Sequence, residues 1–358
     1  MNDIYLENID LNEKEFKEKR FILESKPTRI MVTLTNRCNF KCKMCRWAIR
    51  KKDLTLPAHF IEQIEKLFPY LDYIAWQGGE VFLVGYFKEI FKKIIQFPNI
   101  IQEITTNASL ITEEWAELLS TSNTRLIVSI DSLNKDTYAY IREGGDLDDT
   151  IRNLSLISKA RERNNKTNFF VTGLNIVVMR SNYKELESFV EFAQQYRFNF
   201  LNFMYLVDTL APEEHIFEPL DLEALDYLRV SIPRIIERSR GLGINVCYEF
   251  EPILSNSYTA TKTTSDLGCQ SSVDFDNCLC RLPWMRLFIS GAEEGIKVYP
   301  ECICNIPVGE LAKNSLEEIW NNEMMQLYRI KILNHTYNKW CNYRCIKGLV
   351  NKQFLQNR

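Results

Sequence analysis

Residues 35–47 read TNRCNFKCKMCRW and directly follow an apolar run at residues 30–34. Cys38, Cys42 and Cys45 place three thiols within eight residues of this stretch. Thiolates are soft ligands that select iron–sulfur clusters, zinc or copper(I), and three close-set thiolates can hold three corners of one metal centre. The spacing therefore predicts a metal centre whose fourth corner is left open by this stretch.

Two other interpretations of the three thiols are weaker. Positions i, i+4 and i+7 could form the buried stripe of a helix, because Cys packs as a small hydrophobe. The residues between the cysteines are Asn, Lys and Met, however, and they do not continue such a stripe. Zinc is the stronger alternative, but a structural zinc site needs a fourth ligand, and no further Cys or His lies nearby in the sequence.

The C-x3-C-x2-C run after a first strand resembles the cluster motif of the radical S-adenosylmethionine (SAM) superfamily. The resemblance implies that the three thiolates hold a [4Fe–4S] cluster, while the amine and carboxylate of SAM bind the fourth iron. An electron from the reduced cluster would then cleave SAM to methionine and a 5′-deoxyadenosyl radical, which abstracts hydrogen from a substrate. Met44 departs from the family, which usually has an aromatic residue there beneath the adenine.

The composition is that of an ordinary soluble globular protein. The chain has 358 residues, of which 46% are hydrophobic and 25% charged, with a formal net charge of −3. This charge gives no reason to expect nucleic acid or an anionic membrane as a partner. Neither a signal peptide nor an apolar run long enough to span a membrane is visible. We therefore expect a cytoplasmic protein, and we expect its eleven cysteines to bind metal rather than to form disulfides.

Strand-like and helix-like segments alternate from about residue 30 to residue 250. Six short runs rich in β-branched and aromatic residues predict strands at 30–34, 73–76, 101–105, 126–130, 169–178 and 198–205, with a possible seventh at 244–250. Segments with helical periodicity separate them, and such repeated units imply a parallel sheet with helices outside it. The fold class expected is α/β, a partial (β/α)6 TIM-like barrel with a small C-terminal α+β cluster-binding domain, similar to radical SAM enzymes.

Four segments follow from this pattern. Residues 1–29 are expected to form an N-terminal arm or short helix, and residues 30–250 the barrel. Residues 251–279, rich in Ser, Thr and Asn, predict a linker or lid, and residues 280–358 the auxiliary cluster domain and tail. The short N-terminal arm leaves no room for the leader-binding domain that many peptide-modifying relatives carry.

Residues after the second strand resemble the family's GGE motif. Gly78 and Gly79 allow the backbone to approach a ligand closely, and Glu80 sets a carboxylate at the rim of the barrel. In the family this motif receives the ammonium group of SAM. A pair of glycines is also a common turn, so the position after the strand carries the inference.

Polar residues also follow the third and fourth strands. Asn107 comes after the third strand, and Ser129 and Asp131 come after the fourth. In the family these positions bind the ribose and methionine parts of SAM. Arg142 matches an arginine that the family often directs toward the SAM carboxylate, although an arginine on a solvated helix is an equally good interpretation.

Eight cysteines lie from residue 247 onward. Cys280, a hairpin, a Cys-x-Cys pair, an Ile-Trp-Asn helix and a Cys-x3-Cys pair resemble the auxiliary-cluster domain called SPASM and its truncated form, twitch. We expect one auxiliary [4Fe–4S] cluster held by Cys280, Cys302, Cys341 and Cys345, with Cys304 as an alternative to Cys302. A second cluster using Cys269, Cys278 and Cys304 is supported only by count, and zinc in the tail is a further alternative.

Two features bear on partners and on the end of the reaction. Residues 31–56 contain seven Arg or Lys against one acid, Asp53, and this basic segment could dock an acidic electron donor such as flavodoxin or ferredoxin. Cys247 is most simply a buried small hydrophobe, but a thiol at the barrel mouth could donate a hydrogen atom to a substrate radical, as family epimerases do.

The function predicted is reductive cleavage of SAM and hydrogen abstraction from a small polar substrate of the sugar or cyclitol type. The reaction would end in oxidation by the auxiliary cluster or in epimerisation through Cys247. A radical SAM maturase acting on a peptide, of the ribosomal-peptide precursor or sulfatase type, is the first alternative. A non-catalytic zinc or redox-binding protein is the second.

Overall fold

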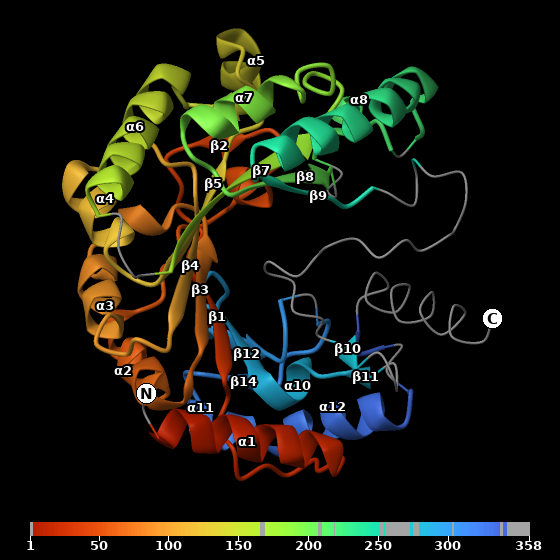
Figure 1. Cartoon of the computed structure of the whole chain (residues 1–358). Helices are drawn as coiled ribbons and strands as arrows, with labels where there is room; N and C mark the ends of the chain where they lie inside the picture. Colours follow the sequence, from red (N-terminus) through yellow and green to blue (C-terminus); the bar gives the residue numbers. More distant parts are fainter. Residues whose placement is uncertain are drawn as a thin grey trace.

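A computed structural model describes residues 3–164, 169–206, 210–217, 219–250, 254, 273–274, 279–302, 304–336 and 339–341. Its largest element is a ten-stranded sheet (Figure 1). Seven successive strands of this sheet run parallel and form the barrel wall. They are β1 (Arg29–Thr35), β3 (Tyr73–Gly78), β4 (Ile101–Thr106), β5 (Thr124–Ser129), β7 (Phe170–Val178), β8 (Phe200–Tyr205) and β9 (Asn245–Tyr248). All six predicted strands and the possible seventh are present.

Helices cover the outer side of this curved sheet (Figure 1). They are α2 (Ile61–Glu65), α3 (Phe87–Ile94), α4 (Glu113–Ser120), α5 (Lys135–Ile141), α6 (Leu147–Arg163), α7 (Ser188–Gln195) and α8 (Leu222–Gly241). Several begin at a side-chain cap: Thr112 accepts the Trp115 amide at the start of α4, and Asp146 accepts two amides at the start of α6. Such caps satisfy amides that the first helical turn leaves without a partner.

The two faces of the barrel strands differ in chemistry. In β1, Ile30, Val32 and Leu34 are fully buried against the helices, and Ile74 and Trp76 of β3 continue this core. Because side chains alternate along a strand, the intervening polar residues face the concave side of the sheet. The concave side is therefore the side available for chemistry.

The C-terminal segment extends the barrel sheet instead of forming a sheet of its own. β12 (Arg286–Ser290) pairs in parallel with β1, and β13 (Lys297–Tyr299) and β14 (Gly309–Glu310) add to it antiparallel. Helices α10 (Leu282–Met285), α11 (Leu316–Trp320) and α12 (Glu323–Leu333) pack beside them. The segment predicted as a separate small domain thus shares one continuous sheet with the barrel.

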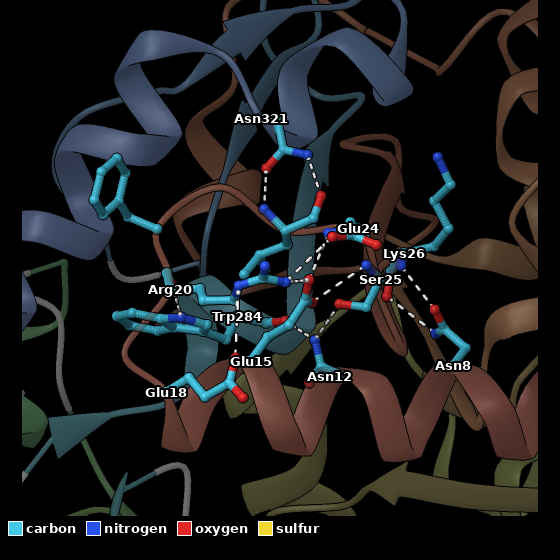
Figure 2. Close-up of polar contacts among 12 residues, drawn as sticks. Asn8, Asn12, Glu15, Glu18, Arg20, Glu24, Ser25, Lys26, Trp284 and Asn321 are labelled. Carbon is cyan, nitrogen blue, oxygen red and sulfur yellow. Dashed lines mark hydrogen bonds and ion pairs between the residues drawn. The ribbon is translucent and has the colours of Figure 1, made fainter.

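The N-terminal arm is a helix that joins the two parts. Helix α1 (Asp3–Lys17) lies under the C-terminal helices, and Figure 2 shows its polar contacts. The carboxylate of Glu15 is fully buried and accepts the backbone amides of Glu24 and Ser25, at 2.6 and 3.2 Å. Asn12 Nδ2 donates to the Ser25 hydroxyl at 2.9 Å and to the Trp284 carbonyl at 2.5 Å. Segments far apart in the sequence are thereby fixed to one another.

Four short strands complete the described strands. They are β2 (Lys41–Cys42), β6 (Arg142–Glu143), β10 (Val273–Asp274) and β11 (Leu279–Cys280). Most of the predicted linker at 251–279 lies outside the described residues. Within the described part of the chain, every helix is too short or too polar to cross a membrane.

Candidate active site

One cavity of about 520 Å³ lies at the carboxyl ends of the barrel strands. Cys38, Cys42 and Cys45, the three cysteines of the motif, line it together. So do most of the other predicted site residues, namely Met44, Gly78, Gly79, Glu80, Asn107, Ser129 and Arg142. Carboxyl strand ends converge in parallel barrels, so residues that are far apart in the sequence meet there.

The glycines of the GGE motif hold the thiol loop in place. A Cβ atom on Gly78 would lie 2.1 Å from the Thr35 carbonyl oxygen, and one on Gly79 would lie 2.0 Å from that of Arg37. The Gly79 amide donates to Thr35 O at 2.7 Å, and the Glu80 amide donates to Arg37 O at 2.8 Å. Gly78 also has φ of +134°, which disfavours any other residue. The close approach that requires glycine is thus to the cluster loop itself.

Glu80 is a completely buried carboxylate beside the thiols. Its oxygens accept the Thr106 hydroxyl at 2.9 and 3.0 Å and the Asn107 amide at 2.9 Å. Burial raises the pKa of Glu80 to about 7, although these hydrogen bonds act in the opposite direction. A carboxylate held this way at the end of β3 can receive a cationic group in the cavity.

Arg142 reaches the thiols from the end of helix α5. Its Nη2 lies 2.8 Å from Asp131 Oδ2, and its Nη1 lies 3.8 Å from Cys42 Sγ. Burial by itself lowers the pKa of Arg142, but the Asp131 carboxylate and the Cys42 thiol raise it by more than burial lowers it. The net pKa is raised, so the guanidinium stays charged. The Nε atom of Arg142 is buried and has no hydrogen-bond partner among the described residues. One donor therefore remains for a ligand.

An apolar surface closes one side of the cavity. Met44 packs with Val177, Ile141, Met179 and Leu206, and this small cluster is separate from the main core. Flexible Met side chains adapt to flat apolar groups. This is the place where the family resemblance puts the adenine.

The donor set fits a metal cluster. Burial raises the pKa of the Cys42 thiol to about 11 and raises that of Cys38 as well. Iron that binds here would have to displace protons from these thiols, which would couple binding to pH. Amide donors already contact Cys38 Sγ, from Phe40 N at 3.4 Å and from Asn107 Nδ2 at 3.9 Å. Such N–H···S contacts are typical of cluster sites.

Two predicted site residues lie away from the cavity lining. Asp131 is fully buried behind Arg142 and accepts the Val177 amide at 2.8 Å, so it contacts Arg142 and not the cavity. Cys247 is exposed on β9, opposite Asn202 of β8, and is not among the described residues that line the cavity. The expectation of a buried Cys247 is wrong, and its role as a hydrogen-atom donor stays a prediction.

Other lining residues were missed from the sequence. Asn175 lines the cavity from β7 and accepts a hydrogen bond from Asn202 at 3.0 Å, while Gln77 donates to Thr33 at 3.4 Å across β3 and β1. A polar residue inside an apolar strand, as in the FVTGLNIVV sequence of β7, was the available signal for Asn175. Met204 has no such signal, because an apolar residue in a strand is ordinarily core.

The C-terminal cysteines occupy different places. Cys302 lines the cavity together with the three N-terminal thiols. Cys304 instead lies opposite Cys341 in an isolated antiparallel bridge, supported by Asn305 Nδ2, which donates to the Cys341 carbonyl at 3.0 Å. Cys280 ends β11, whereas Cys345, Cys269 and Cys278 lie outside the described residues.

Comparison with known proteins bears directly on this arrangement. Residues 32–193 match the radical SAM superfamily profile, and residues 280–346 match an iron–sulfur cluster-binding domain, SPASM. The chain therefore has a radical SAM domain followed by a SPASM domain. Both matched regions meet at the cavity, since the first supplies Cys38, Cys42 and Cys45 and the second supplies Cys302.

The individual proteins that resemble this chain share little sequence identity with it. A GTP 3′,8-cyclase of Syntrophomonas wolfei is 28% identical over 192 residues, which are 50% of this chain and 56% of that protein, so the chain spans little more than half of its length. The crystal structure of Streptococcus suis SuiB bound to S-adenosylmethionine superposes with a TM-score of 0.62 at 17% identity, covering 90% of this chain and 71% of that one. The structure of anSMEcpe with bound AdoMet gives 0.59 at 19% identity, covering 84% and 82%.

Proposed function

We propose that the chain binds a [4Fe–4S] cluster at Cys38, Cys42 and Cys45 and uses it to cleave SAM and abstract hydrogen from a substrate. The observation that carries this proposal is the convergence of three thiols, a buried carboxylate and a buried guanidinium with a spare N–H in one cavity. When bound, the cluster supplies the electron that splits SAM into methionine and a 5′-deoxyadenosyl radical.

The protein's own residues would position SAM. Glu80 would accept the ammonium group, and the free Nε of Arg142 would donate to the carboxylate. Met44 and its apolar neighbours would pack against the adenine, with Ser129 and Asn107 beside the ribose and methionine. Both of these groups are on the methionyl α-carbon of SAM, so holding them at one end and the adenine at the other would restrict the orientation of the sulfonium between them, which is how positioning contributes to rate.

We further propose that the reaction ends in oxidation of the substrate. Cys302 of the SPASM region lines the same cavity as the N-terminal thiols, so a substrate there lies between the two cysteine groups. One auxiliary [4Fe–4S] cluster, held by Cys280, Cys341, Cys345 and either Cys302 or Cys304, would take the electron of the substrate radical. The isolated β-bridge between the backbones of Cys304 and Cys341 supports Cys304 as the alternative fourth ligand, whereas Cys302 as a ligand would bring that cluster to the cavity. Epimerisation through Cys247 is less well supported, because Cys247 is not part of the described lining.

A small polar substrate of the sugar or cyclitol type remains our first candidate, because Thr33, Gln77 and Asn175 present hydroxyl and amide groups to the cavity. A peptide side chain is the second candidate. It is favoured by the SPASM match and by SuiB and anSMEcpe, whose structures include complexes with the precursor peptide SuiA and with the Cp18Cys peptide.

The basic segment would dock an acidic electron donor such as flavodoxin or ferredoxin. Arg37 and Arg50 pair with Asp53, and Lys52 pairs with Glu294. Lys41, Arg46 and Lys51 are exposed, and within the described residues they have no ion-pair partner. Three exposed cations beside the thiol loop would attract an acidic protein, and the rate of reduction should fall as salt rises.

Two measurements test the proposed function. Anaerobically reconstituted protein should contain about eight irons if both clusters form, and it should release 5′-deoxyadenosine from SAM when dithionite is added. A Cys38→Ala/Cys42→Ala/Cys45→Ala variant should lose that release but keep the iron of the auxiliary cluster. Release that persists in this variant would refute the site.

The substrate class can be tested without knowing the substrate. Cells grown in deuterated medium would supply an extract that is separated into small-molecule and peptide fractions. Deuterium should appear in 5′-deoxyadenosine only with the fraction that holds the substrate, because the abstracted hydrogen is transferred to it. Label from the small-molecule fraction supports the sugar or cyclitol proposal, and label from the peptide fraction overturns it in favour of a maturase.

A further inference from the structure

Arg142 has a second relationship to the thiols besides its position near SAM. Strand β6, which contains Arg142, pairs antiparallel with strand β2, which contains Cys42, and Arg142 and Cys42 are direct partners in the register. The Lys43 amide donates to the Ile141 carbonyl at 2.9 Å and locks this short ladder. The guanidinium is therefore fixed to the cluster loop by backbone, independently of any ligand.

Both terminal nitrogens of the guanidinium contact side chains of the protein. Nη1 contacts Cys42 Sγ at 3.8 Å, and Nη2 pairs with Asp131 at 2.8 Å. Within the described residues, Arg142 is the one charged donor that contacts any of the three sulfurs, since Cys38 receives only the neutral donors Phe40 N and Asn107 Nδ2. Only 6% of the Arg142 side chain is exposed, so solvent screens this charge weakly.

Asp131 sets how much of that positive charge the sulfur experiences. It is fully buried, and it is held from the far side by the Val177 amide at 2.8 Å and by Asn182 Nδ2, which donates to its carbonyl at 2.7 Å. These contacts fix Asp131 to the end of the fifth barrel strand. The carboxylate partly cancels the guanidinium, so the two residues act on Cys42 in opposite directions.

A cation and N–H donors next to a cluster sulfur favour the reduced cluster, which carries one more negative charge, and so raise its reduction potential. We propose that the Asp131–Arg142 pair sets the reduction potential of the cluster at Cys38, Cys42 and Cys45 through the contact with Cys42, with Arg142 raising the potential and Asp131 lowering it. This inference rests on the proposed function, and it makes both of them positioning residues for electron entry.

The test is a potentiometric titration of the reconstituted full-length protein, without SAM, followed by electron paramagnetic resonance. The signal absent from the Cys38→Ala/Cys42→Ala/Cys45→Ala variant identifies the relevant cluster. Arg142→Gln should lower the reduced-to-oxidised ratio at a given potential about tenfold, a shift of about 59 mV to a more negative value for one electron. Asp131→Asn should shift the potential in the positive direction.

The potentials of Arg142→Gln and Asp131→Asn should shift in opposite directions, and this distinguishes the proposal from a structural effect. Both variants break the same buried ion pair, so general destabilisation would move both potentials the same way or neither. Arg152→Gln is the matched control, because it removes one positive charge from an exposed pair with Asp149 on α6 and should leave the potential unchanged. Equal potentials for wild type, Arg142→Gln and Asp131→Asn, or shifts of one sign, would overturn the proposal.

If the Arg142→Gln variant fails to hold the cluster, a second substitution at the same position still tests the proposal. Arg142→Lys keeps the positive charge without the planar fork, and it should give a potential between those of wild type and Arg142→Gln. Iron content and the presence of the signal report on the proposed cluster site, whereas the midpoint reports on the Asp131–Arg142 pair, so the two failures are distinct. A midpoint for Arg142→Lys equal to wild type, with Asp131→Asn also unchanged, contradicts the inference.

Discussion

Two arginines in the described part of the chain are almost completely buried, and their surroundings differ. Arg142 lies at the cavity that the three N-terminal thiols line, with one carboxylate partner, one thiol contact and an Nε that has no partner among the described residues. Arg329 lies on α12 beneath the barrel and has no carboxylate within ion-pair distance in the described part of the chain. It donates to the carbonyls of Phe21, Pro283 and Trp320 and to Asn321 Oδ1, at 2.8 to 2.9 Å.

The difference shows two ways of keeping a buried charge. Burial lowers the pKa of Arg329 to about 9, which still leaves it protonated at neutral pH, and three backbone dipoles and the Trp320 ring face its charge. All its contacts are internal, and they tie the N-terminal segment to α10 and α11. Arg142 lines a cavity, and its Nε has no hydrogen-bond partner among the described residues. A guanidinium whose three nitrogens all have partners indicates a structural role, and one that leaves a nitrogen without a partner at a cavity indicates a site.

Breaking Arg329 should have the largest effect on stability. Arg329→Met leaves the carbonyls of Phe21, Pro283 and Trp320 without their side-chain donor and removes one of the two donors of Asn321 Oδ1, so we expect the free energy of unfolding to fall by about 3–5 kcal/mol. Urea unfolding of the cluster-free protein under anaerobic conditions would measure this loss. An Arg329→Met protein as stable as wild type would show that these contacts are not a structural anchor.

The two arginines also differ in whether a second substitution can remove the partner that each leaves behind. Arg142→Met leaves Asp131 as an unpaired buried charge, and adding Asp131→Asn removes that charge, so the double variant should recover about 2 kcal/mol of the loss. For Arg329→Met no single second substitution removes the acceptors, because three of them are backbone carbonyls. Asn321→Ala in the Arg329→Met background is therefore expected to recover little. Unfolding midpoints of the four variants and wild type complete the comparison.

Glu80 extends the comparison to a buried acid. Its pKa of about 7 means that the carboxyl is mostly protonated at pH 6 and ionised at pH 8. Because the ionised carboxylate is the form that best accepts the N–H groups of the SAM amine, affinity for SAM should fall as pH falls, approaching tenfold per unit below pH 7. Calorimetric titration of the reconstituted protein at pH 6, 7 and 8 measures it. Glu80→Gln should bind weakly and show a flat profile, and an equally steep profile in that variant would assign the effect elsewhere.

An exposed pair should matter least. Lys26 contacts Glu317 at 2.8 Å, but the Glu317 side chain is 80% exposed. Such surface pairs contribute little because water screens them, so Lys26→Gln should change the free energy of unfolding by less than about 0.5 kcal/mol. A loss of unfolding free energy as large as that of Arg329→Met would mean that an exposed ion pair, rather than the buried hydrogen bonds of Arg329, holds the N-terminal segment in place.

Much of the barrel could be predicted from local patterns. Alternation of β-branched runs with helical periods located the strands within a few residues, from 30–34 against the observed β1 to 198–205 against β8. The three thiols were readable because a cluster motif is short and contiguous. Contacts between distant segments were not readable. Nothing in the local sequence indicates that β12 pairs with β1, or that the glycines at 78 and 79 press against the loop at 35–37.

The sequence by itself determined the chemistry at the N-terminal loop, because the spacing of Cys38, Cys42 and Cys45 alone fixes three soft ligands near one another. It also determined the order of strands and helices. Only the tertiary structure decided which charges meet that chemistry, since Arg142 reaches Cys42 from a distant part of the chain and brings Asp131 with it as its ion-pair partner. The physical reason is that a side chain's periodicity reports which face it occupies, whereas its partners depend on how whole strands and helices pack.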